Sequence, residues 1–150
     1  MGTGILLAVV LTLNILTYMI SFVRYYGDGM EPTLQGGQIL LISKIGNVSE
    51  GDIVAFYYNN KVLVRRVICE GGKMISMSQD GIVTIDGTIL EEPYVEKPSI
   101  GQCDITFPYM VLRNHVFVMG DQREISMDSR LEAIGVIPEA NIIGKVVFAW

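Results

Sequence analysis

The chain has 150 residues, half of them hydrophobic, and a formal net charge of −5 at pH 7. This length suits about one domain of ordinary size. The acidic balance and the lack of a basic stripe argue against a nucleic-acid-binding protein, so we expect no nucleic acid among its partners.

The N-terminal segment is the most apolar part of the chain. Residues 1–23 carry no charged side chain, and residues 5–23 form the run ILLAVVLTLNILTYMISFV. About 20 such residues, rising ~1.5 Å each, span a lipid hydrocarbon core. A cleaved signal peptide is the alternative, but a basic n-region and an Ala-x-Ala-type site are missing, and the run exceeds the usual h-region. The sequence therefore predicts a transmembrane anchor in residues 1–25, held in the lipid bilayer, followed by a second domain in residues 26–150.

Beyond the anchor, the sequence predicts strands almost throughout, because runs rich in Val, Ile, Tyr and Phe are bounded by Gly, Asn or Asp. The predicted strands are residues 38–43, 52–58, 61–69, 73–78, 82–86, 88–90, 109–119 and 142–148. Asn59-Asn60 and Asp86-Gly87 suit the two-residue turns of tight hairpins. Residues 91–107 are expected to form a loop, and residues 135–141 a turn with at most one helical turn. The predicted fold class is mostly β, with an antiparallel β-sheet domain on one N-terminal transmembrane helix.

The two cysteines, Cys69 and Cys103, lack the spacing of a metal site. We therefore predict no metal site and no cofactor. The two residues are either free thiols or one disulfide, and the small apolar neighbours of Cys69 favour a free, buried thiol. No residue pattern indicates an oligomeric state.

Three stretches carry the chemistry. GDGMEPTL, residues 27–34, is predicted to be a shaped loop that leads into a strand, and such loops often present reactive groups. Gly29, at the centre of this loop, has no side chain to present. The other two stretches are VLVRRVICEGGKMI, residues 62–75, and GDQREISMDSR, residues 120–130.

In order and spacing, these stretches resemble the three boxes of type I signal peptidases of the single-span, Gram-positive kind. The family patterns are Gly-x-Ser-Met-x-Pro-Thr-Leu, Tyr-Val-Lys-Arg-Val-Ile-Gly-x-x-Gly-Asp and Gly-Asp-Asn-Arg-x-x-Ser-x-Asp-Ser-Arg. The third box is highly specific, the other two are moderately so, and the resemblance covers essentially the whole chain. It implies a Ser/Lys peptidase fold, a single-pass protein of the cell membrane, and a β domain on the extracytoplasmic side.

The resemblance also implies a catalytic pair. In the family, a serine attacks the peptide bond after an Ala-x-Ala-like site, and a lysine kept neutral by apolar burial is the general base. The matching positions here are Gly29 for the nucleophile and Arg65 for the base. Glycine has no nucleophile, and arginine stays protonated and offers no acceptor. Either loss alone removes nearly all catalysis that depends on the pair.

Other matched positions would support the site. Ser126 matches a serine that hydrogen-bonds the lysine, and Asp128 and Arg130 match a salt bridge beneath the site. His115, the only histidine, lies in a predicted strand and is expected to be structural rather than a substitute base. The full set of site-supporting positions is Gly27, Asp28, Met30, Pro32, Arg66, Asp121, Ser126, Asp128 and Arg130.

The substitution at residue 65 raises a question of burial. By strand alternation, Arg65 shares a face with Leu63 and Val67. Burying an unpaired guanidinium would cost several kcal/mol. We therefore expect Arg65 either to reach water along its apolar stem or to pair with a carboxylate, with Asp28 as the first candidate.

Two functions are compatible with these residues. The first is a catalytically inactive, membrane-anchored protein that binds an extended peptide by strand addition. Its partners would be signal-peptide-bearing or pilin precursors, because family members without the catalytic pair are associated with pilus assembly in Gram-positive bacteria. The alternative is a genuine signal peptidase, a serine endopeptidase, that carries inactivating substitutions at residues 29 and 65. A self-cleaving repressor-type peptidase is disfavoured by the membrane span, and an endoplasmic-reticulum-type enzyme by the arginine at residue 65.

Overall fold

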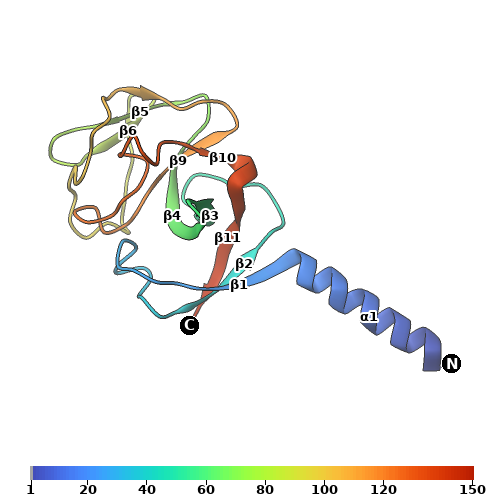
Figure 1. The fold of residues 1–150 in the computed structure, drawn as a ribbon. Helices are drawn as coiled ribbons and strands as arrows, with labels where there is room; N and C mark the ends of the chain where they lie inside the picture. Colours follow the sequence, from blue (N-terminus) through green and yellow to red (C-terminus); the bar gives the residue numbers. More distant parts are fainter. Residues whose placement is uncertain (1) are drawn as a thin grey trace.

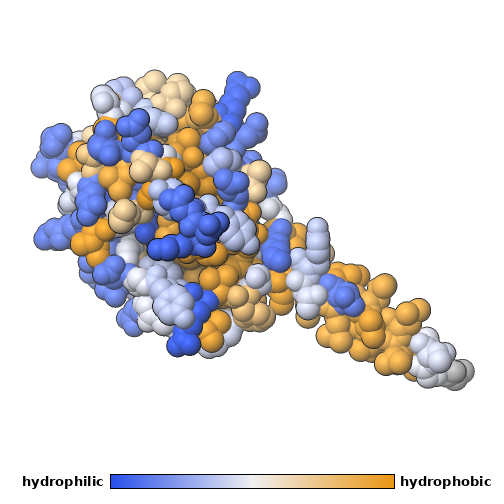
Figure 2. All heavy atoms as spheres, viewed as in Figure 1, coloured by the Kyte–Doolittle hydropathy of each residue, from blue (hydrophilic) through white to orange (hydrophobic). Residues whose placement is uncertain are grey.

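The N-terminal apolar run forms a helix that stands apart from the rest of the protein. In the computed structural model, which describes residues 2–150, helix α1 (Gly2–Met19) projects from the β domain as a stalk (Figure 1). Its surface is mostly hydrophobic (Figure 2), and none of its residues is buried against the domain. By length and composition, it is able to cross a membrane.

The helix is shorter than the predicted span. Helix α1 ends at Met19, so the last residues of the apolar run, 20–23, are not helical. Ile20–Arg24 form strand β1, which pairs antiparallel with β2 (Ile39–Ser43). Hydropathy alone does not separate an apolar helix from an apolar strand, and the edge of β2 supplies backbone partners that the sequence pattern does not reveal.

The fold-class prediction is confirmed: beyond α1 the protein consists of two antiparallel sheets. The larger sheet has the order β1-β2-β11-β3-β4-β9-β10 and the smaller one β7-β6-β5-β8. In the larger sheet, the further strands are β3 (Ile53–Tyr58), β4 (Lys61–Glu70), β9 (His115–Met119), β10 (Ile137–Pro138) and β11 (Ile142–Ala149). In the smaller sheet, the strands are β5 (Met74–Met77), β6 (Val83–Ile85), β7 (Thr88–Ile89) and β8 (Tyr109–Met110).

The two predicted hairpin turns are confirmed. Asn59 and Asn60 have φ values of 47° and 60°, and Asp86 and Gly87 have values of 48° and 82°. Left-handed backbone at both central residues is the requirement of the tight turn that connects twisted strands. These turns fix the registers of β3 with β4 and of β6 with β7.

Two predicted segments differ in the structure. The single strand expected over residues 109–119 is divided into β8 and β9, which join different sheets, and Asn114 in the break has a φ of 60°. Residues 135–141 contain the short strand β10 as well as a 3₁₀ turn (Glu139–Asn141). The loop expected over residues 91–107 contains no helix or strand.

The apolar core lies in three clusters, and strand β4 contributes to all of them. Val64 packs with Met30 and Leu40, and Val67 packs with the β3 and β9 side chains. Cys69 belongs to the third cluster, between β4 and the smaller sheet. Cys69 and Cys103 are both free thiols, so the disulfide alternative is excluded. Arg65 and Arg66 are the charged residues in the interior of this strand, which has Lys61 and Glu70 at its ends.

Candidate functional site

The loop that contains Gly29 is held in place from within. Tyr25, which is almost fully buried, accepts a hydrogen bond from the Met30 amide at its hydroxyl oxygen, 3.1 Å away. The Met30 side chain is completely buried, and its carbonyl oxygen accepts a bond from the Leu34 amide. Gly29 is therefore buried between Tyr25 and Met30, the two residues that fix the loop, although it carries no side chain.

The positions matched to the nucleophile and the base lie side by side. An ideal Cβ at Gly29 would be 3.4 Å from the central carbon and one terminal nitrogen of the Arg65 guanidinium. It would also be 3.4 Å from the hydroxyl oxygen of Ser126. All three residues line a cavity of about 300 Å³, together with Gly27 and Asp28. The structure thus brings together residues from the first loop, strand β4 and the loop after β9.

Arg65 is buried without a carboxylate partner, which overturns both expectations for its side chain. Only 8% of it is exposed. Its Nε donates to the Met127 carbonyl at 2.9 Å, and a terminal nitrogen donates to the Val64 carbonyl at 2.7 Å. Within residues 2–150 no carboxylate lies within ion-pair distance of it, and Asp28 is exposed instead. Burial lowers the pKa of Arg65 and the charge of Asp128 opposes that change, yet a guanidinium remains protonated.

Ser126 has a buried hydroxyl with no hydrogen-bond partner within the described residues 2–150. The hydroxyl faces the empty side-chain position of Gly29. It also packs against Gly120, where an added Cβ would overlap both the Ser126 hydroxyl and the Gly29 carbonyl oxygen. The close packing of these three residues therefore requires glycine at residue 120.

Asp128 and Arg130 form the ion pair that the resemblance implies. Both residues are completely buried, and the guanidinium donates to the two carboxylate oxygens at 2.8 Å each. The Gly120 amide donates to the same carboxylate at 3.0 Å. Arg130 also donates to the carbonyl oxygens of Arg123 and Ser126. This network fixes the loop that carries Ser126.

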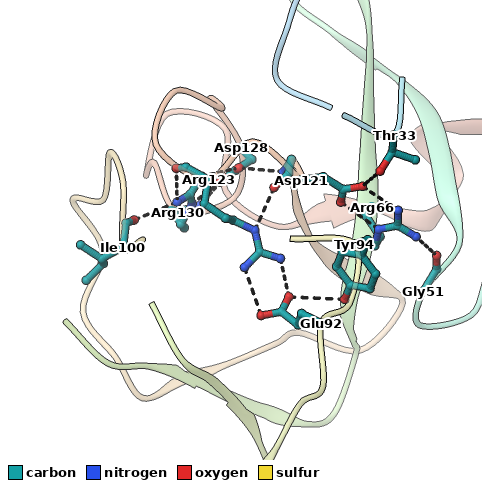
Figure 3. Close-up of polar contacts among 11 residues, drawn as sticks. Thr33, Gly51, Arg66, Glu92, Tyr94, Ile100, Asp121, Arg123, Asp128 and Arg130 are labelled. Carbon is teal, nitrogen blue, oxygen red and sulfur yellow. Dashed lines mark hydrogen bonds and ion pairs between the residues drawn. The ribbon is translucent and has the colours of Figure 1, made fainter. Parts of the chain in front are cut away.

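Arg66 and Asp121 form a second pair (Figure 3), and strand alternation places Arg66 on the opposite face of β4 from Arg65. The Arg66 guanidinium donates to both oxygens of Asp121, at 2.9 and 2.6 Å. Thr33 donates its hydroxyl to the same carboxylate, and Tyr94 stacks against the guanidinium with 3.9 Å between that group and the ring centre. The pair thus joins the Gly29 loop, strand β4 and the segment after β9.

A third buried pair was not predicted. Arg123 is completely buried and donates to both oxygens of Glu92 and to the Gly120 carbonyl (Figure 3). Its position inside GDQREISMDSR was a signal that it belongs to the site. Glu92 lies in the loop that we expected over residues 91–107, and nothing in its spacing points to Arg123.

Some predicted residues lie away from the cavity. Pro32 is exposed, and His115 begins strand β9, with its ring nitrogen beside the Arg113 carbonyl oxygen. Neither lines the space around Gly29. A larger open hollow of about 980 Å³, between the ends of β2, β4 and β11, contains none of the predicted site residues. Within residues 2–150 no group of histidine, cysteine and carboxylate side chains is arranged to hold a metal ion.

The arrangement around Gly29 and Arg65 differs chemically from a Ser/Lys pair. The cavity offers a fixed positive charge, an unpaired hydroxyl and an empty side-chain position. It offers no nucleophile at residue 29 and no proton acceptor at residue 65.

Comparisons with known proteins agree with this geometry. The sequence model of the family described as "Signal peptidase, peptidase S26" matches residues 1–150. The chain is 33% identical to signal peptidase I T of Bacillus subtilis over 99% of its own length and 83% of that protein. It is 32% identical to a probable signal peptidase I-1 of Synechocystis, over 97% of this chain and 79% of that protein. A crystal structure of a signal peptidase I from Enterococcus faecalis matches with a TM-score of 0.57 and 26% identity, covering 67% of this chain and 97% of that one.

Proposed function

Because the chain belongs to the signal peptidase family, peptidase S26, we propose that it is a membrane-anchored member that binds precursor peptides without cleaving them. One observation carries the proposal: the position of the base is filled by the buried, protonated guanidinium of Arg65, beside a glycine at the position of the nucleophile. A group that only donates hydrogen bonds does not take a proton from a nucleophile or from water. The clients that we propose are secreted precursors and, from the resemblance to family members without the pair, pilin precursors.

An unpaired strand edge offers a way to bind an extended peptide. Strand β4 pairs with β3 along Lys61–Arg66, but its pairing with β9 begins only at Arg66. The opposite edge of residues 61–64 lines the cavity that contains Gly29. An extended peptide that adds to this edge would form backbone hydrogen bonds and run toward Arg65.

The same proposal places the protein in the cell membrane. We assign residues 1–25 to the anchor, with α1 as the spanning part, and residues 26–150 to an extracytoplasmic, peptide-binding β domain. Phe22, Phe148 and Trp150 are exposed and pack together near the end of α1, with ring centres 6.0 and 5.4 Å apart for successive pairs. Aromatic side chains of this kind are enriched at membrane–water interfaces.

A cleavage assay tests the proposal. The full chain in detergent micelles is incubated with a precursor that contains an Ala-x-Ala site, and products are followed by mass spectrometry. We expect no product above that of a Gly29→Ala preparation purified in the same way, while photo-crosslinking captures the precursor. Turnover by the unaltered chain that is absent from the Gly29→Ala preparation would contradict the proposal. Failure to crosslink any precursor would contradict its binding half.

A second candidate function has one observation in its favour. The backbone of Gly29 is not left-handed, and a Cβ there would make ordinary contacts with Arg65 and Ser126. The loop therefore still accepts a serine, which suits a genuine signal peptidase with substitutions at residues 29 and 65. The natural gene decides between the two, because serine and lysine codons at these positions would establish the peptidase.

A further inference from the structure

Arg65 differs in its charge balance from the three other arginines of this domain whose side chains are buried or nearly so. Arg66, Arg123 and Arg130 each hold a carboxylate through two hydrogen bonds (Figure 3). Their partners are Asp121, Glu92 and Asp128. Arg65 is buried to a similar degree but bonds only to two backbone carbonyl oxygens. A desolvated cation without a counter-charge is unfavourable, so a bound anion would stabilise the site.

Asp128 and Asp28, the carboxylates whose charges act on Arg65, do not form an ion pair with it. Asp128 has its two carboxylate oxygens engaged by Arg130 and the Gly120 amide. Asp28 is exposed, and its side chain makes no hydrogen bond or ion pair with any residue from 2 to 150. An anion in direct contact with the free donors of Arg65 would therefore come from a ligand.

The free donors of the site point into one space. A guanidinium has five N–H groups, and Arg65 directs one from Nε and one from a single terminal nitrogen to carbonyl oxygens. Its other terminal nitrogen lies 3.4 Å from the side-chain position of Gly29. The buried, unpartnered hydroxyl of Ser126 lies at the same distance from that position. The Gly29 amide also has no acceptor within residues 2–150.

We propose that this cavity binds the terminal carboxylate of an extended peptide. The Arg65 guanidinium and the Ser126 hydroxyl would donate hydrogen bonds to it, and the carboxylate would occupy the space that the missing side chain of Gly29 leaves empty. A carboxylate is planar and accepts several short hydrogen bonds, which suits a guanidinium beside a hydroxyl. The inference rests on the proposed function, because the peptide reaches the cavity along the free edge of β4. It adds a ligand class: among the extended peptides that bind along this edge, those that end at the cavity are held more tightly, through their terminal carboxylate.

Matched peptides test this inference. The probe is a fluorescent peptide that ends in Ala-x-Ala, prepared as the free acid and as the C-terminal amide, and titrated into the full chain in detergent micelles. We expect the acid to bind about 10 to 100 times more tightly than the amide, since charge-assisted hydrogen bonds in a desolvated site are strong. A third peptide, amidated and carrying one glutamate in place of x, separates a side-chain carboxylate from a terminal one.

Variants assign the preference to the site. Arg65→Met should abolish the preference for the acid. Gly29→Ala should reduce the preference for the acid at least tenfold while the charge of Arg65 is unchanged. The added methyl group makes only ordinary contacts, but it fills the space that the carboxylate would occupy. The matched control is Arg113→Met, which removes an exposed arginine outside the cavity and should leave the preference unchanged.

Each outcome separates this inference from the proposed function. Equal binding of acid and amide overturns the inference and leaves peptide binding intact. Equal binding of the free acid and the glutamate peptide overturns the assignment to a terminal carboxylate. Binding of neither peptide overturns the proposed function as well. If Arg65→Met does not fold, Gly29→Ala still tests the inference. An unchanged preference for the acid in Gly29→Ala would contradict binding of the carboxylate in the space beside residue 29.

Discussion

Gly120 and Ser126 are packed so closely that a side chain on the first would occupy the space of the hydroxyl of the second. The contact closes the loop after β9 on itself and brings that loop against the Gly29 carbonyl oxygen, with which the Gln122 amide forms a hydrogen bond of 3.0 Å. The unpaired hydroxyl of Ser126 is thus held in place by backbone and by a glycine, and not by a hydrogen bond of its own.

The variant Gly120→Ala should destabilise the protein and displace Ser126. Overpacking of a well-filled interior commonly costs about 1–3 kcal/mol, and here the obstacle is partly backbone, which does not move aside easily. Thermal unfolding of the full chain in micelles, followed by circular dichroism, measures the change. Gly29→Ala is the matched control in the same cavity and should lower stability by less than about 1 kcal/mol. Equal losses of stability in Gly120→Ala and Gly29→Ala would show that a side chain at residue 120 is accommodated as easily as one at residue 29.

Asp128→Asn should be strongly destabilising, because it leaves Arg130 buried without its counter-charge. Breaking a buried ion pair from one side typically costs about 3–5 kcal/mol. The same denaturation experiment measures it, with Glu124→Gln as the control, since the Lys97–Glu124 pair is exposed. That control should leave stability unchanged within error. A small loss in Asp128→Asn would indicate that the backbone donors of the loop hold it without the charge.

Cys69 should resist alkylation while the protein is folded. Burial in the apolar cluster beside β5 raises the pKa of the Cys69 thiol to about 12, with nearby Glu50 acting in the same direction. Compared with a thiol at its ordinary value of 9.0, the reactive thiolate is about a thousandfold scarcer at pH 8. Iodoacetamide labelling with mass spectrometry should show Cys69 modified only after unfolding, and the partly exposed Cys103 should react in the folded protein. Rapid labelling of Cys69 under native conditions would contradict its burial.

Because the pKa of the Cys69 thiol is raised in the folded protein, we expect the protein to lose stability at alkaline pH. Below about pH 9 it is protonated in both folded and unfolded states, so its contribution is constant. Between about pH 9 and 12 the unfolded chain loses a proton that the folded chain keeps, and stability falls as pH rises. Tyr94, whose pKa burial raises to about 12, acts in the same direction. Unfolding temperatures measured across this range should fall less steeply in Cys69→Ala than in the unaltered chain, and identical slopes would exclude the contribution of the thiol.

The sequence was informative where chemistry is local and weak where it depends on a distant partner. Alternation and turn residues predicted most strands, and the motif order predicted that Gly29, Arg65 and Ser126 belong to one site. The strand Ile20–Arg24 was missed because its partner β2 lies 15 or more residues further along the chain, and an apolar run is equally compatible with a helix. Glu92 was missed for the same kind of reason: its partner Arg123 lies 31 residues away.

Arg65 shows a different limit of prediction from sequence, which concerns the hydrogen-bond partners of a buried side chain. Strand alternation correctly indicated a buried position, and the physical rule that buried charges are paired then predicted a carboxylate or escape to water. The guanidinium instead bonds to the carbonyl oxygens of Val64 and Met127 and leaves donors directed at the empty position of Gly29. A sequence shows which residues are charged, but whether two carbonyl oxygens converge on one of them is set by the packing of the Met127 loop. This exception to the pairing rule is the observation from which we propose that the cavity binds a carboxylate.

The double variant Gly29→Ser with Arg65→Lys should gain peptidase activity, and neither single change should. A serine at residue 29 makes ordinary contacts, and the Ser126 hydroxyl, which has no partner within residues 2–150, is placed beside both positions and is free to hydrogen-bond a lysine amine. The lysine, in a site where burial already lowers the pKa of a basic group, would be deprotonated more readily than in water and would act as the base. Arg65→Lys alone supplies a base without a nucleophile, and Gly29→Ser alone supplies a nucleophile beside a cation that takes no proton. Cleavage of an Ala-x-Ala precursor by the full chain in micelles is the readout, and adding Ser126→Ala to the double variant should reduce the gain. An inert double variant with an unchanged unfolding temperature would mean that the remaining residues no longer support hydrolysis, which would favour a dedicated binding protein over a peptidase altered at two positions.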